Sequence, residues 1–346
     1  MLSRLSGALQ IAAVYIGTVV GAGFATGREI VEFFSQYGFY GLLGILLAGY
    51  LFIVMGTKIM LLAVSIEAKS YQELNQHLFG KKYGLFVNIL FFIMLFGVTA
   101  VMLSGAGAVF EEQIGLSKMA GVLITIVVAL FVLHRGIKGL FMVNMLVVPS
   151  MITFSFLLFF QGIGNPYYID YFFYVSSDIR NLKVIISPFL YTAFNLALAQ
   201  AVLVPVAYEI KDRSIIKLGG IIGGLFLTLI LLTSHLSLIT LQNISEYDIP
   251  SAELMKHAAA PLYWIFIIVI YGEIFTSLVG NVFGLEKPIK EYVPINSMLI
   301  FISLLLGALL ISTIQYGKLL SFLYPLFGYV SLLFLLLLFR SKDKKI

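Results

Sequence analysis

The sequence contains no cysteine, and this absence excludes several kinds of protein chemistry. There can be no disulfide framework, no thiolate metal site and no cysteine nucleophile. Charge is also scarce: aspartate, glutamate, lysine and arginine make up 11% of the 346 residues, whereas a soluble domain carries about 25%. The sequence is instead rich in apolar residues, with 60% hydrophobic side chains and a mean hydropathy of +1.03. These values predict an integral membrane protein that is embedded in the lipid bilayer.

Apolar segments long enough to cross about 30 Å of hydrocarbon occur ten times along the chain. The first lacks a small-x-small cleavage site and is expected to remain as a span. We therefore expect an all-α integral membrane protein, a single domain over residues 1–346, with about ten transmembrane helices. The predicted spans cover residues 8–34, 38–66, 84–110, 118–133, 138–161, 184–209, 215–241, 261–283, 295–314 and 317–339.

Basic residues are distributed unevenly between the two sides of these spans. If the N-terminus is cytoplasmic, sixteen lysines and arginines lie on the cytoplasmic side and six on the outer side. This positive-inside bias places both termini in the cytoplasm of a bacterial-type cell membrane, with residues 340–346 as a basic cytoplasmic tail. The same distribution accounts for the net charge of +5 without a nucleic-acid partner.

A long polar and aromatic connection, residues 162–183, separates the first five spans from the last five. Residues 8–161 and 184–339 are expected to be two repeats. Because each repeat has an odd number of spans, the second must be inverted relative to the first. Residues 244–260 are predicted to form a short amphipathic helix over the outer mouth.

The first predicted span is interrupted by glycine. Residues 17–27 contain four glycines, each of which costs roughly 1 kcal/mol relative to alanine in a helix. Unwound backbone is tolerated in a membrane only where it is buried in protein or lines a cavity. A glycine-interrupted span therefore indicates a transport site, and close packing of helices through small residues is the alternative interpretation.

An inverted repeat requires a matching irregularity in the sixth span. That span has no glycine, but Asn195 and Gln200 lie in its middle, and Pro205 removes a backbone donor. We therefore expect the first and sixth helices both to be broken near the midplane. Two amides in an apolar core need hydrogen-bond partners. These partners are either groups of a bound ligand or groups of a neighbouring helix.

Several short motifs resemble those of known transporters. Residues 17–23 (G-T-V-V-G-A-G) resemble the unwound G-N-A-V-G-L-G of the neurotransmitter:sodium symporters, and residues 194–199 (F-N-L-A-L-A) resemble their sixth-span F-T-L-S-L-G. Thr276 and Ser277 resemble their sodium-binding pair. The chain is thus similar to the amino acid–polyamine–organocation (APC) superfamily with the LeuT-type five-plus-five inverted repeat. More narrowly, it resembles the YkvI-type bacterial membrane proteins, which are described as amino acid permeases.

The resemblance implies one sodium site, and no cofactor beyond a coupling sodium ion. Carbonyls at a helix break are free to bind a cation, whereas hydroxyls in an apolar helix often bond back to the preceding turn. A second sodium site of those symporters needs a carboxamide where this sequence has Phe24, so we expect that site to be absent. The implied sodium ligands are the carbonyls of Gly17, Val20 and Glu273 and the hydroxyls of Thr276 and Ser277.

The resemblance also places a solute beside the break. Exposed amides after the break suit a carboxylate, and carbonyls of an opposing half-helix suit an ammonium group, so an amino acid or a similar small zwitterion is expected. The sequence does not define the oligomeric state, and a monomer is compatible with it. The residues predicted to line the solute site are Val19, Ala22, Gly23, Phe24, Val98, Met102, Phe194, Asn195, Ala197, Gln200 and Ser277.

The ionisable residues of the spans each have more than one interpretation. Glu273 lies in mid-span, where a charge costs at least about 2.5–3.5 kcal/mol. It is either a coupling group or a neutral acid that is hydrogen-bonded to a neighbouring span. Arg28 and Glu29, with Glu32, form either an outer gate or a solvated helix end. His235 is expected to be packed and hydrogen-bonded.

Other functional classes fit the sequence less well. A membrane enzyme needs clustered catalytic groups, but the sequence has no His-x-x-x-His, no Ser-His-Asp set and no Walker motif. A channel would show a repeated filter loop or a ring of charged residues. We therefore expect a sodium-coupled secondary transporter that works by alternating access, and not an enzyme. The alternatives are a proton-coupled or uncoupled permease for another small organic solute, and a membrane sensor that does not transport.

Overall fold

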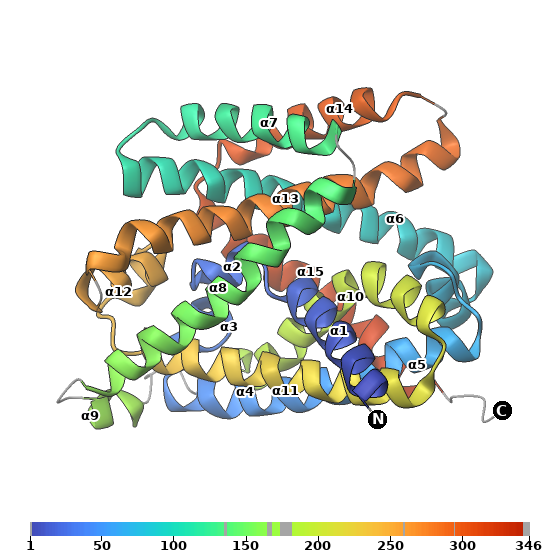
Figure 1. The fold of residues 1–346 in the computed structure, drawn as a ribbon, viewed down its shortest axis with the longest axis horizontal. Helices are drawn as coiled ribbons and strands as arrows, with labels where there is room; N and C mark the ends of the chain where they lie inside the picture. Colours follow the sequence, from blue (N-terminus) through green and yellow to red (C-terminus); the bar gives the residue numbers. More distant parts are fainter. Residues whose placement is uncertain are drawn as a thin grey trace.

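The computed structural model describes residues 2–134, 137–164, 168–173, 182–258, 260–293 and 295–341, and every element in these ranges is a helix (Figure 1). Among the described residues, six helical segments are long and apolar enough to cross a membrane, and three shorter apolar helices accompany them. The all-α membrane class is therefore confirmed. The six long segments are Phe39–Ser65, Tyr71–Ile114, Lys183–Ile210, Arg213–Leu238, Ala260–Glu286 and Tyr316–Arg340.

The helices follow one another with short connections, and two π-helical turns interrupt the first half. The elements of the first half are α1 (Leu2–Val19), α2 (Ala22–Ala25), α3 (Arg28–Phe33), the 3-10 turn η1 (Ser35–Tyr37), α4 (Phe39–Leu51), the π-helical turn η2 (Phe52–Gly56), α5 (Thr57–Ser65), α6 (Tyr71–Ala108), the π-helical turn η3 (Val109–Ile114), α7 (Lys118–His134) and α8 (Ile137–Ile163). Those of the second half are α9 (Tyr168–Phe172), α10 (Lys183–Ile210), α11 (Arg213–Leu238), the 3-10 turn η4 (Ile244–Glu246), α12 (Pro250–Ala258), the 3-10 turn η5 (Ala260–Leu262), α13 (Tyr263–Tyr292), α14 (Ser297–Ser312) and α15 (Tyr316–Arg340).

Each of the ten predicted spans coincides with helix in the structure. The short amphipathic helix predicted within residues 244–260 is present as α12. Parts of the predicted connection 162–183 and most of the predicted tail 340–346 lie outside the described residues.

The first predicted span is in three pieces, α1, α2 and α3, so the break expected from its glycines is confirmed. The break predicted in the sixth span is wrong, because α10 is one continuous helix that contains both Pro188 and Pro205. No glycine weakens α10. In membrane proteins the backbone groups that a proline frees are satisfied by neighbouring helices and side chains. Proline without glycine was therefore insufficient to predict unwinding.

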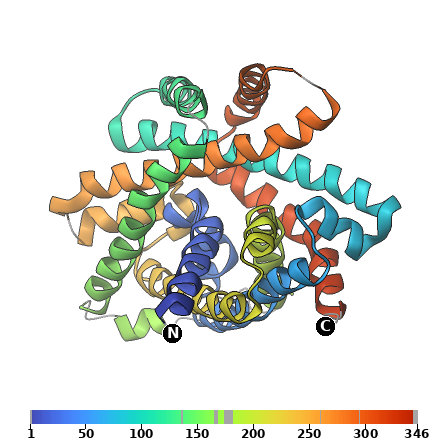
Figure 2. The same ribbon diagram turned by 45° about the vertical axis from the view of Figure 1, so that its right-hand side comes forward.

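Two crossing helices organise the centre of the molecule. Helices α6 and α13 cross each other, and α7 and α14 pack together over them (Figures 1 and 2). On the opposite side α4 and α11 run side by side, and α1 packs along α11 toward the centre. Helix α15 packs against α10. The pieces of the broken span therefore end among α6, α10, α13 and α15.

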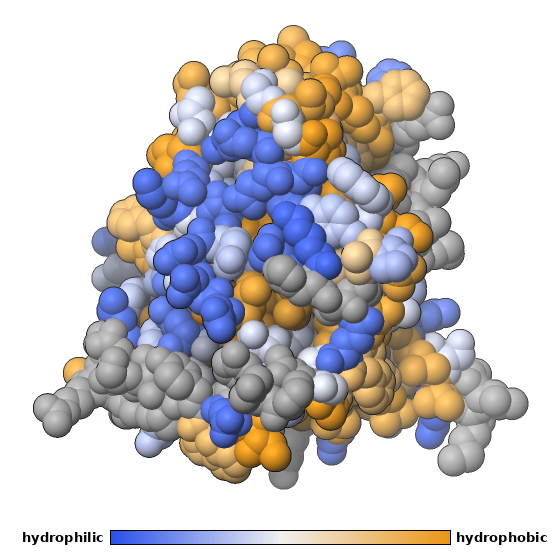
Figure 3. Space-filling view, turned by 90° about the vertical axis from the view of Figure 1, so that its left-hand side faces the viewer, coloured by the Kyte–Doolittle hydropathy of each residue, from blue (hydrophilic) through white to orange (hydrophobic). Residues whose placement is uncertain are grey.

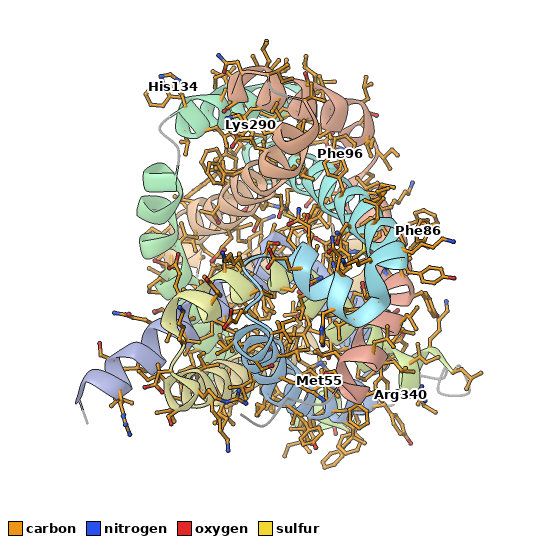
Figure 4. The ribbon with its side chains drawn as sticks, turned by 90° about the vertical axis from the view of Figure 1, so that its right-hand side faces the viewer. Met55, Phe86, Phe96, His134, Lys290 and Arg340 are labelled. Carbon is orange, nitrogen blue, oxygen red and sulfur yellow. The ribbon has the colours of Figure 1, made fainter. Side chains whose placement is uncertain are left out.

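The two ends of the helices are polar, and the sides between them are apolar. Figure 3 looks onto the end that carries α12, where hydrophilic side chains gather between hydrophobic flanks. Figure 4 looks onto the opposite end, where His134, Lys290 and Arg340 lie near the ends of α7, α13 and α15. Large apolar side chains are exposed along the sides, among them Phe131 at 61% and Leu310 at 76%. This distribution fits a protein surrounded by lipid between two aqueous faces.

Helix α1, the first piece of the broken span, is anchored by one buried tyrosine. The Tyr15 hydroxyl of α1 donates to the Phe52 carbonyl at the start of the π-helical turn η2, at 2.8 Å. Gly56 makes this approach feasible, because a Cβ at that position would lie 2.0 Å from the Tyr15 hydroxyl oxygen. Helix α1 is therefore fixed against η2 before the chain reaches the break.

Candidate functional site

The candidate site begins where α1 ends. Val19 is the last residue of α1, and Gly21 is extended, with φ of −127° and ψ of −168°, before α2 begins. The carbonyls of Gly17 and Val20 accept no hydrogen bond from the described residues, and the first backbone bond beyond the break joins Ala25 N to the Gly21 carbonyl at 2.9 Å. A helix end leaves such acceptors free. The two predicted cation-binding carbonyls are thus unpaired.

Helix α13 faces the break through the predicted hydroxyl pair. A Cβ on Gly21 would lie 3.3 Å from Ser277 Oγ, so Ser277 contacts the unwound backbone directly. The Thr276 hydroxyl donates to the carbonyl of Glu273 at 3.1 Å, which is the back-bond expected of a threonine within a helix. Sequence motifs far apart in the chain, the glycine stretch and Thr276-Ser277, are therefore adjacent in space.

Glu273 lies on the same face of α13 as Ser277, because positions i and i+4 of a helix are neighbours. Its side chain is only 1% exposed, and its Oε1 atom is buried without a hydrogen-bond partner among the described residues. A buried polar atom without a partner costs about 1–3 kcal/mol. The site therefore contains an unsatisfied acceptor that a proton, a cation or a ligand donor could satisfy.

The residues on the two sides of the break differ in exposure. Small and polar residues of α13 from Ser277 toward Lys290 are partly or fully exposed, whereas residues 22–27 beyond the break are buried. The spacings along α13 are those of one helix face. The partly or fully exposed residues are Ser277, Gly280, Asn281 and Gly284 on α13, Gly17 and Thr18 on α1, and Gly21 at the break.

Helix α10 places its two amides in different surroundings. The Asn195 side-chain nitrogen donates to Glu29 Oε1 at 3.1 Å and to the Tyr191 carbonyl at 3.0 Å. Gln200 is fully buried, and neither its oxygen nor its nitrogen has a partner among the described residues. Asn195 thus connects α10 to α3, as predicted by the interpretation in which the amides form hydrogen bonds between helices. Gln200 retains the unsatisfied amide expected of a ligand-binding side chain.

The predicted apolar lining is buried around these groups. The Phe194 ring packs on Tyr324, with ring centroids 4.5 Å apart, and on Phe327 at 6.2 Å. Phe327 in turn fits against Gly97 of α6, where a Cβ would lie 2.6 Å from its ring. Helices α6, α10 and α15 therefore meet beside the break. The predicted lining residues with at most 5% exposure are Val19, Ala22, Phe24, Val98, Met102, Phe194 and Ala197.

Phe24 lies beside a small cavity that has a mostly apolar lining. This cavity has a volume of about 20 Å³, and the hydroxyl-bearing residues in its lining are Ser155, Ser234, Ser237 and Ser251. Such a volume holds about one water molecule. The side chain of Phe24 is therefore directed toward α8, α11 and α12.

Arg28 and Glu29 point in different directions, although both were predicted as an outer gate. The Arg28 guanidinium donates to the carbonyls of Ser245 and Tyr247, at 2.6 Å and 2.9 Å, beside η4. The Glu29 side chain is 3% exposed and contacts Gly23 and Asn195. The left-handed Gly27, with φ of +78°, turns the chain between α2 and α3 and sets this geometry.

Several hydrogen bonds close the α12 end over the break. The Ser251 amide donates to the Thr26 carbonyl at 3.0 Å, and the hydroxyls of Thr26 and Tyr316 lie 2.9 Å apart. The Gly317 amide donates to Asp248 Oδ1 at 2.9 Å. Helices α2, α12 and α15 are thus held together at this end.

Lys256 on α12 belongs to the solvated part of the same end. It forms an ion pair with Glu253 at 3.0 Å. Partial burial is the largest single effect and lowers the pKa of Lys256, but the hydrogen bond to Glu253 and the attraction of nearby acidic groups together raise that pKa. The lysine is therefore charged at neutral pH, like an ordinary surface lysine.

Sequence reasoning missed the tyrosines that surround the break. Tyr191, Tyr316 and Tyr324 are at most 2% exposed, and they come from α10 and α15. No local pattern distinguishes them among the 19 tyrosines of the chain. His235 was predicted correctly, since it is buried and its Nδ1 lies 3.0 Å from the Ser35 hydroxyl. Within the described residues, no three His, Asp or Glu side chains gather into a metal site.

Comparison with known proteins identifies the family. The sequence matches no family model. The membrane protein YkvI of Bacillus subtilis (strain 168) is 47% identical over 337 residues, which are 95% of this chain and 94% of that protein. The chain belongs to the YkvI family. YyaD of the same organism is a more distant relative of this YkvI-family member, 24% identical over 328 residues and 93% of each chain.

Two solved transporters share the fold of this YkvI-family chain. One is Mhp1, a nucleobase-cation-symport-1 family transporter solved in a closed conformation with bromovinylhydantoin bound. Its TM-score is 0.62 at 11% identity, over 88% of this chain and 70% of Mhp1. The other is the Eremococcus coleocola manganese transporter, with a TM-score of 0.55 at 15% identity, over 95% of this chain and 76% of that one. Both are transporters of the LeuT-type fold, and at such identities the likeness concerns the fold alone.

Proposed function

We propose that this YkvI-family protein is a secondary active transporter that works by alternating access, with two inverted five-helix repeats. The observation that carries the proposal is the break in α1 beside Ser277 of α13. Unpaired carbonyls at Gly17 and Val20 lie at this break, which has partly exposed residues on one side and buried residues on the other. Irregular backbone within a membrane-spanning helix is typical of solute and ion sites in transporters. The fold shared with two known transporters supports the same class.

The proposed solute is an amino acid or a similar small zwitterion. Its carboxylate would be held by the unpaired amides after the break, in residues 21–24, together with the unsatisfied amide of Gln200. Because α10 is continuous, it offers no half-helix end for an ammonium group, so free carbonyls of α1 would take that role. Phe194 and Met102 would close the site on its apolar side. An APC-superfamily amino acid permease in a bacterial cell membrane, with both termini in the cytoplasm, fits this arrangement.

The proposed coupling ion is sodium, bound by the carbonyls of Gly17, Val20 and Glu273 and by the hydroxyls of Thr276 and Ser277. Ser277 touches Gly21, and its hydroxyl makes no hydrogen bond within the described residues. A hydroxyl that back-bonds, as Thr276 does, keeps its oxygen lone pairs available to a cation. A proton-coupled or uncoupled permease is the second candidate, and the unpartnered Oε1 of Glu273 is the observation that favours a proton.

A thermal-shift screen of amino acids and amines, each in sodium and in potassium, tests the solute and the ion together. A ligand at 100 times its Kd stabilises the folded protein by about 2.7 kcal/mol, so a true solute raises the melting temperature more in sodium. We expect T276A/S277A to abolish the sodium-dependent part. The matched control is S312A/T313A at the end of α14, an adjacent Ser-Thr pair whose hydroxyls back-bond as that of Thr276 does, at 2.9 Å each.

Uptake into proteoliposomes decides between the coupling ions. We expect accumulation to follow an imposed sodium gradient in the wild type and in the α14 control. Accumulation that ignores sodium and follows a pH gradient would contradict sodium coupling and direct attention to Glu273, for which E273Q is the test. Binding without any accumulation would instead support a sensor.

A further inference from the structure

The carboxyl group of Glu29 is enclosed by the protein. The side chain is 3% exposed, and its Oε1 atom accepts a hydrogen bond from Asn195 of α10 at 3.1 Å. Its Oε2 atom lies against the backbone of α2, 2.5 Å from the position of a Cβ on Gly23. Any side chain at residue 23 would displace the carboxyl, so the absence of one leaves room for it beside the break.

No ion pair neutralises this carboxyl in the described part of the chain. The neighbouring Arg28 directs its guanidinium to the carbonyls of Ser245 and Tyr247. The ion pairs recorded among the described residues are Lys256 with Glu253 and Lys290 with Glu286, and neither involves Glu29. An ionised carboxylate buried without a partner is strongly disfavoured. The closed structure therefore needs a neutral Glu29 or a cation that reaches it.

The groups around Glu29 favour a proton over a metal ion. Asn195 presents its NH2 group to the carboxyl, and the same nitrogen donates to the Tyr191 carbonyl, which fixes the orientation of the amide. An NH2 group cannot ligate a cation. The packing against Gly23 also leaves little space at Oε2. A proton requires no space, and it removes the buried charge.

Apart from Arg28, whose guanidinium is directed to the carbonyls beside η4, the described titratable groups near Glu29 form no ion pair with it. Tyr191 of α10 and Tyr316 and Tyr324 of α15 face it. The Tyr191 hydroxyl lies close to the Glu29 carboxyl and can act as a neutral donor to it, and the Tyr316 hydroxyl pairs with Thr26. On the remaining elements packed against α3, His235 of α11 is bonded to Ser35, and Asp248 beyond η4 is bonded to the Gly317 amide. Nothing else in the described surroundings can neutralise the carboxylate.

We propose that Glu29 is a proton-binding site that takes up a proton when the α12 end closes and releases it when that end opens. In the closed form the acid is neutral and held by Asn195. Opening admits water, which stabilises the carboxylate, and the proton returns to the solution on that side. Only the opening step rests on the proposed alternating access. The neutral state of the closed form stands independently of any solute or of sodium.

Infrared spectroscopy of the purified protein tests the neutral state without a solute. A protonated carboxyl has a C=O stretching band that shifts in D2O. We expect such a band at neutral pH, lost in E29Q and retained in E32Q, a control on the same helix whose side chain is partly exposed. Since Glu273 can contribute its own band, E273Q is measured alongside. A spectrum that E29Q leaves unchanged overturns the proposal.

The Arg28→Gln variant tests whether opening releases the proton of Glu29. The direction in which the pH dependence of the Glu29 band shifts distinguishes opening from a simple loss of charge. Loss of a nearby positive charge alone would favour the protonated acid, so the Glu29 band would persist to higher pH. Loss of the Arg28 bonds that close the α12 end admits water, so we expect the band to disappear at lower pH than in the wild type. Lys256→Gln, at an exposed lysine of the same end, is the control and should leave the band in place. Persistence of the band in R28Q contradicts the opening step.

A fallback variant covers the case in which E29Q does not fold. Glu29→Asp keeps the acid but shortens its reach to Asn195. We expect its band to move in frequency and to titrate at a different pH from that of the wild type. An E29D spectrum identical to the wild type, in frequency and titration, would show that the band does not come from this residue. Failure of the solute screen would leave these spectra unaffected, so the two proposals fail separately.

Discussion

The hydrogen bond between Asn195 and Glu29 joins α3, the last piece of the broken span, to α10. Replacing Asn195 by leucine removes this bond. Leucine has the same γ-branched arrangement of heavy atoms as asparagine, with bulkier methyl groups and no donor. The variant loses the bond to Glu29 Oε1 at 3.1 Å and the bond to the Tyr191 carbonyl at 3.0 Å. The Tyr191 carbonyl keeps its ordinary helix bond. The unsatisfied group is therefore Glu29 Oε1.

The expected cost follows from the burial of that oxygen. A buried acceptor that loses a donor costs about 1–3 kcal/mol when no other group takes the place of that donor. Glu29 is 3% exposed, so water cannot replace the lost donor without opening the structure. At a low-end conversion of about 2 °C per kcal/mol, N195L should lower the melting temperature by about 2–6 °C.

A double-mutant cycle separates this bond from other effects of the substitution. Glu29→Met removes the acceptor at similar length and leaves Asn195 bonded to Tyr191, so its cost should be smaller than that of N195L. The double variant E29M/N195L leaves no unsatisfied group between the two helices. We expect it to be more stable than the sum of the single variants predicts, by about 0.5–3 kcal/mol.

The assay is thermal unfolding in detergent followed by circular dichroism of the helices. Tryptophan fluorescence is unsuitable, because the only tryptophan, Trp264, is 58% exposed. Strict additivity of the two substitutions would refute the reasoning, since it would mean that Glu29 and Asn195 do not interact. A cost of N195L below that of E29M would equally contradict the assignment of the unsatisfied oxygen.

Two further predictions concern the inner half of the broken span and access to the break. Gly56→Ala should destabilise the protein by about 1–3 kcal/mol through overpacking, because its Cβ would lie 2.0 Å from the Tyr15 hydroxyl. The control is Gly284→Ala, because a Cβ at Gly284 would have nothing within 4 Å. This variant should be neutral or more stable by up to about 1 kcal/mol. Equal melting temperatures of the two variants would contradict the packing of Tyr15 against Gly56. The chain has no native cysteine, so a single introduced cysteine reports access to the break. We expect S277C to react with a membrane-impermeant thiol reagent that is added from the Lys290 side. We expect T26C to resist the reagent from either side. Fast labelling of T26C would show that the α12 end is open.

The positions of the helices and of the break in the first span could be predicted from the sequence, because both depend on local composition. Apolar length defines a span, and four glycines between residues 17 and 27 weaken a helix wherever they occur. The same logic failed for α10. Its irregularity was inferred from Pro205 and two polar residues, but a single proline removes only one backbone donor, and α10 has no glycine to unwind it.

The partners of buried polar groups could be predicted only where the family motif supplied them. The proximity of Gly21 to Ser277 was expected from the motif. The contact of Glu29 with Asn195, 166 positions along the chain, depends on a left-handed turn at Gly27 that rotates α3. A one-residue insertion in that turn would rotate α3 by one helix position, so that Arg28 would point where Glu29 now points. No spacing rule within the sequence contains this information.

The closed end shows most clearly why a gate is difficult to predict from side chains. The sequence suggested a charged gate at Arg28 and Glu29, yet the bonds that close this end mostly use backbone groups. Arg28 donates to two carbonyls, the Ser251 amide donates to the Thr26 carbonyl, and Asp248 accepts from the Gly317 amide. Backbone groups are present at every residue, so no composition signal marks them. The hydrogen bonds of Arg28 and of these backbone groups therefore oppose opening. An ionised Glu29 would instead favour opening, because opening returns water to the buried carboxylate. A proton that binds Glu29 removes this charge and so favours the closed end.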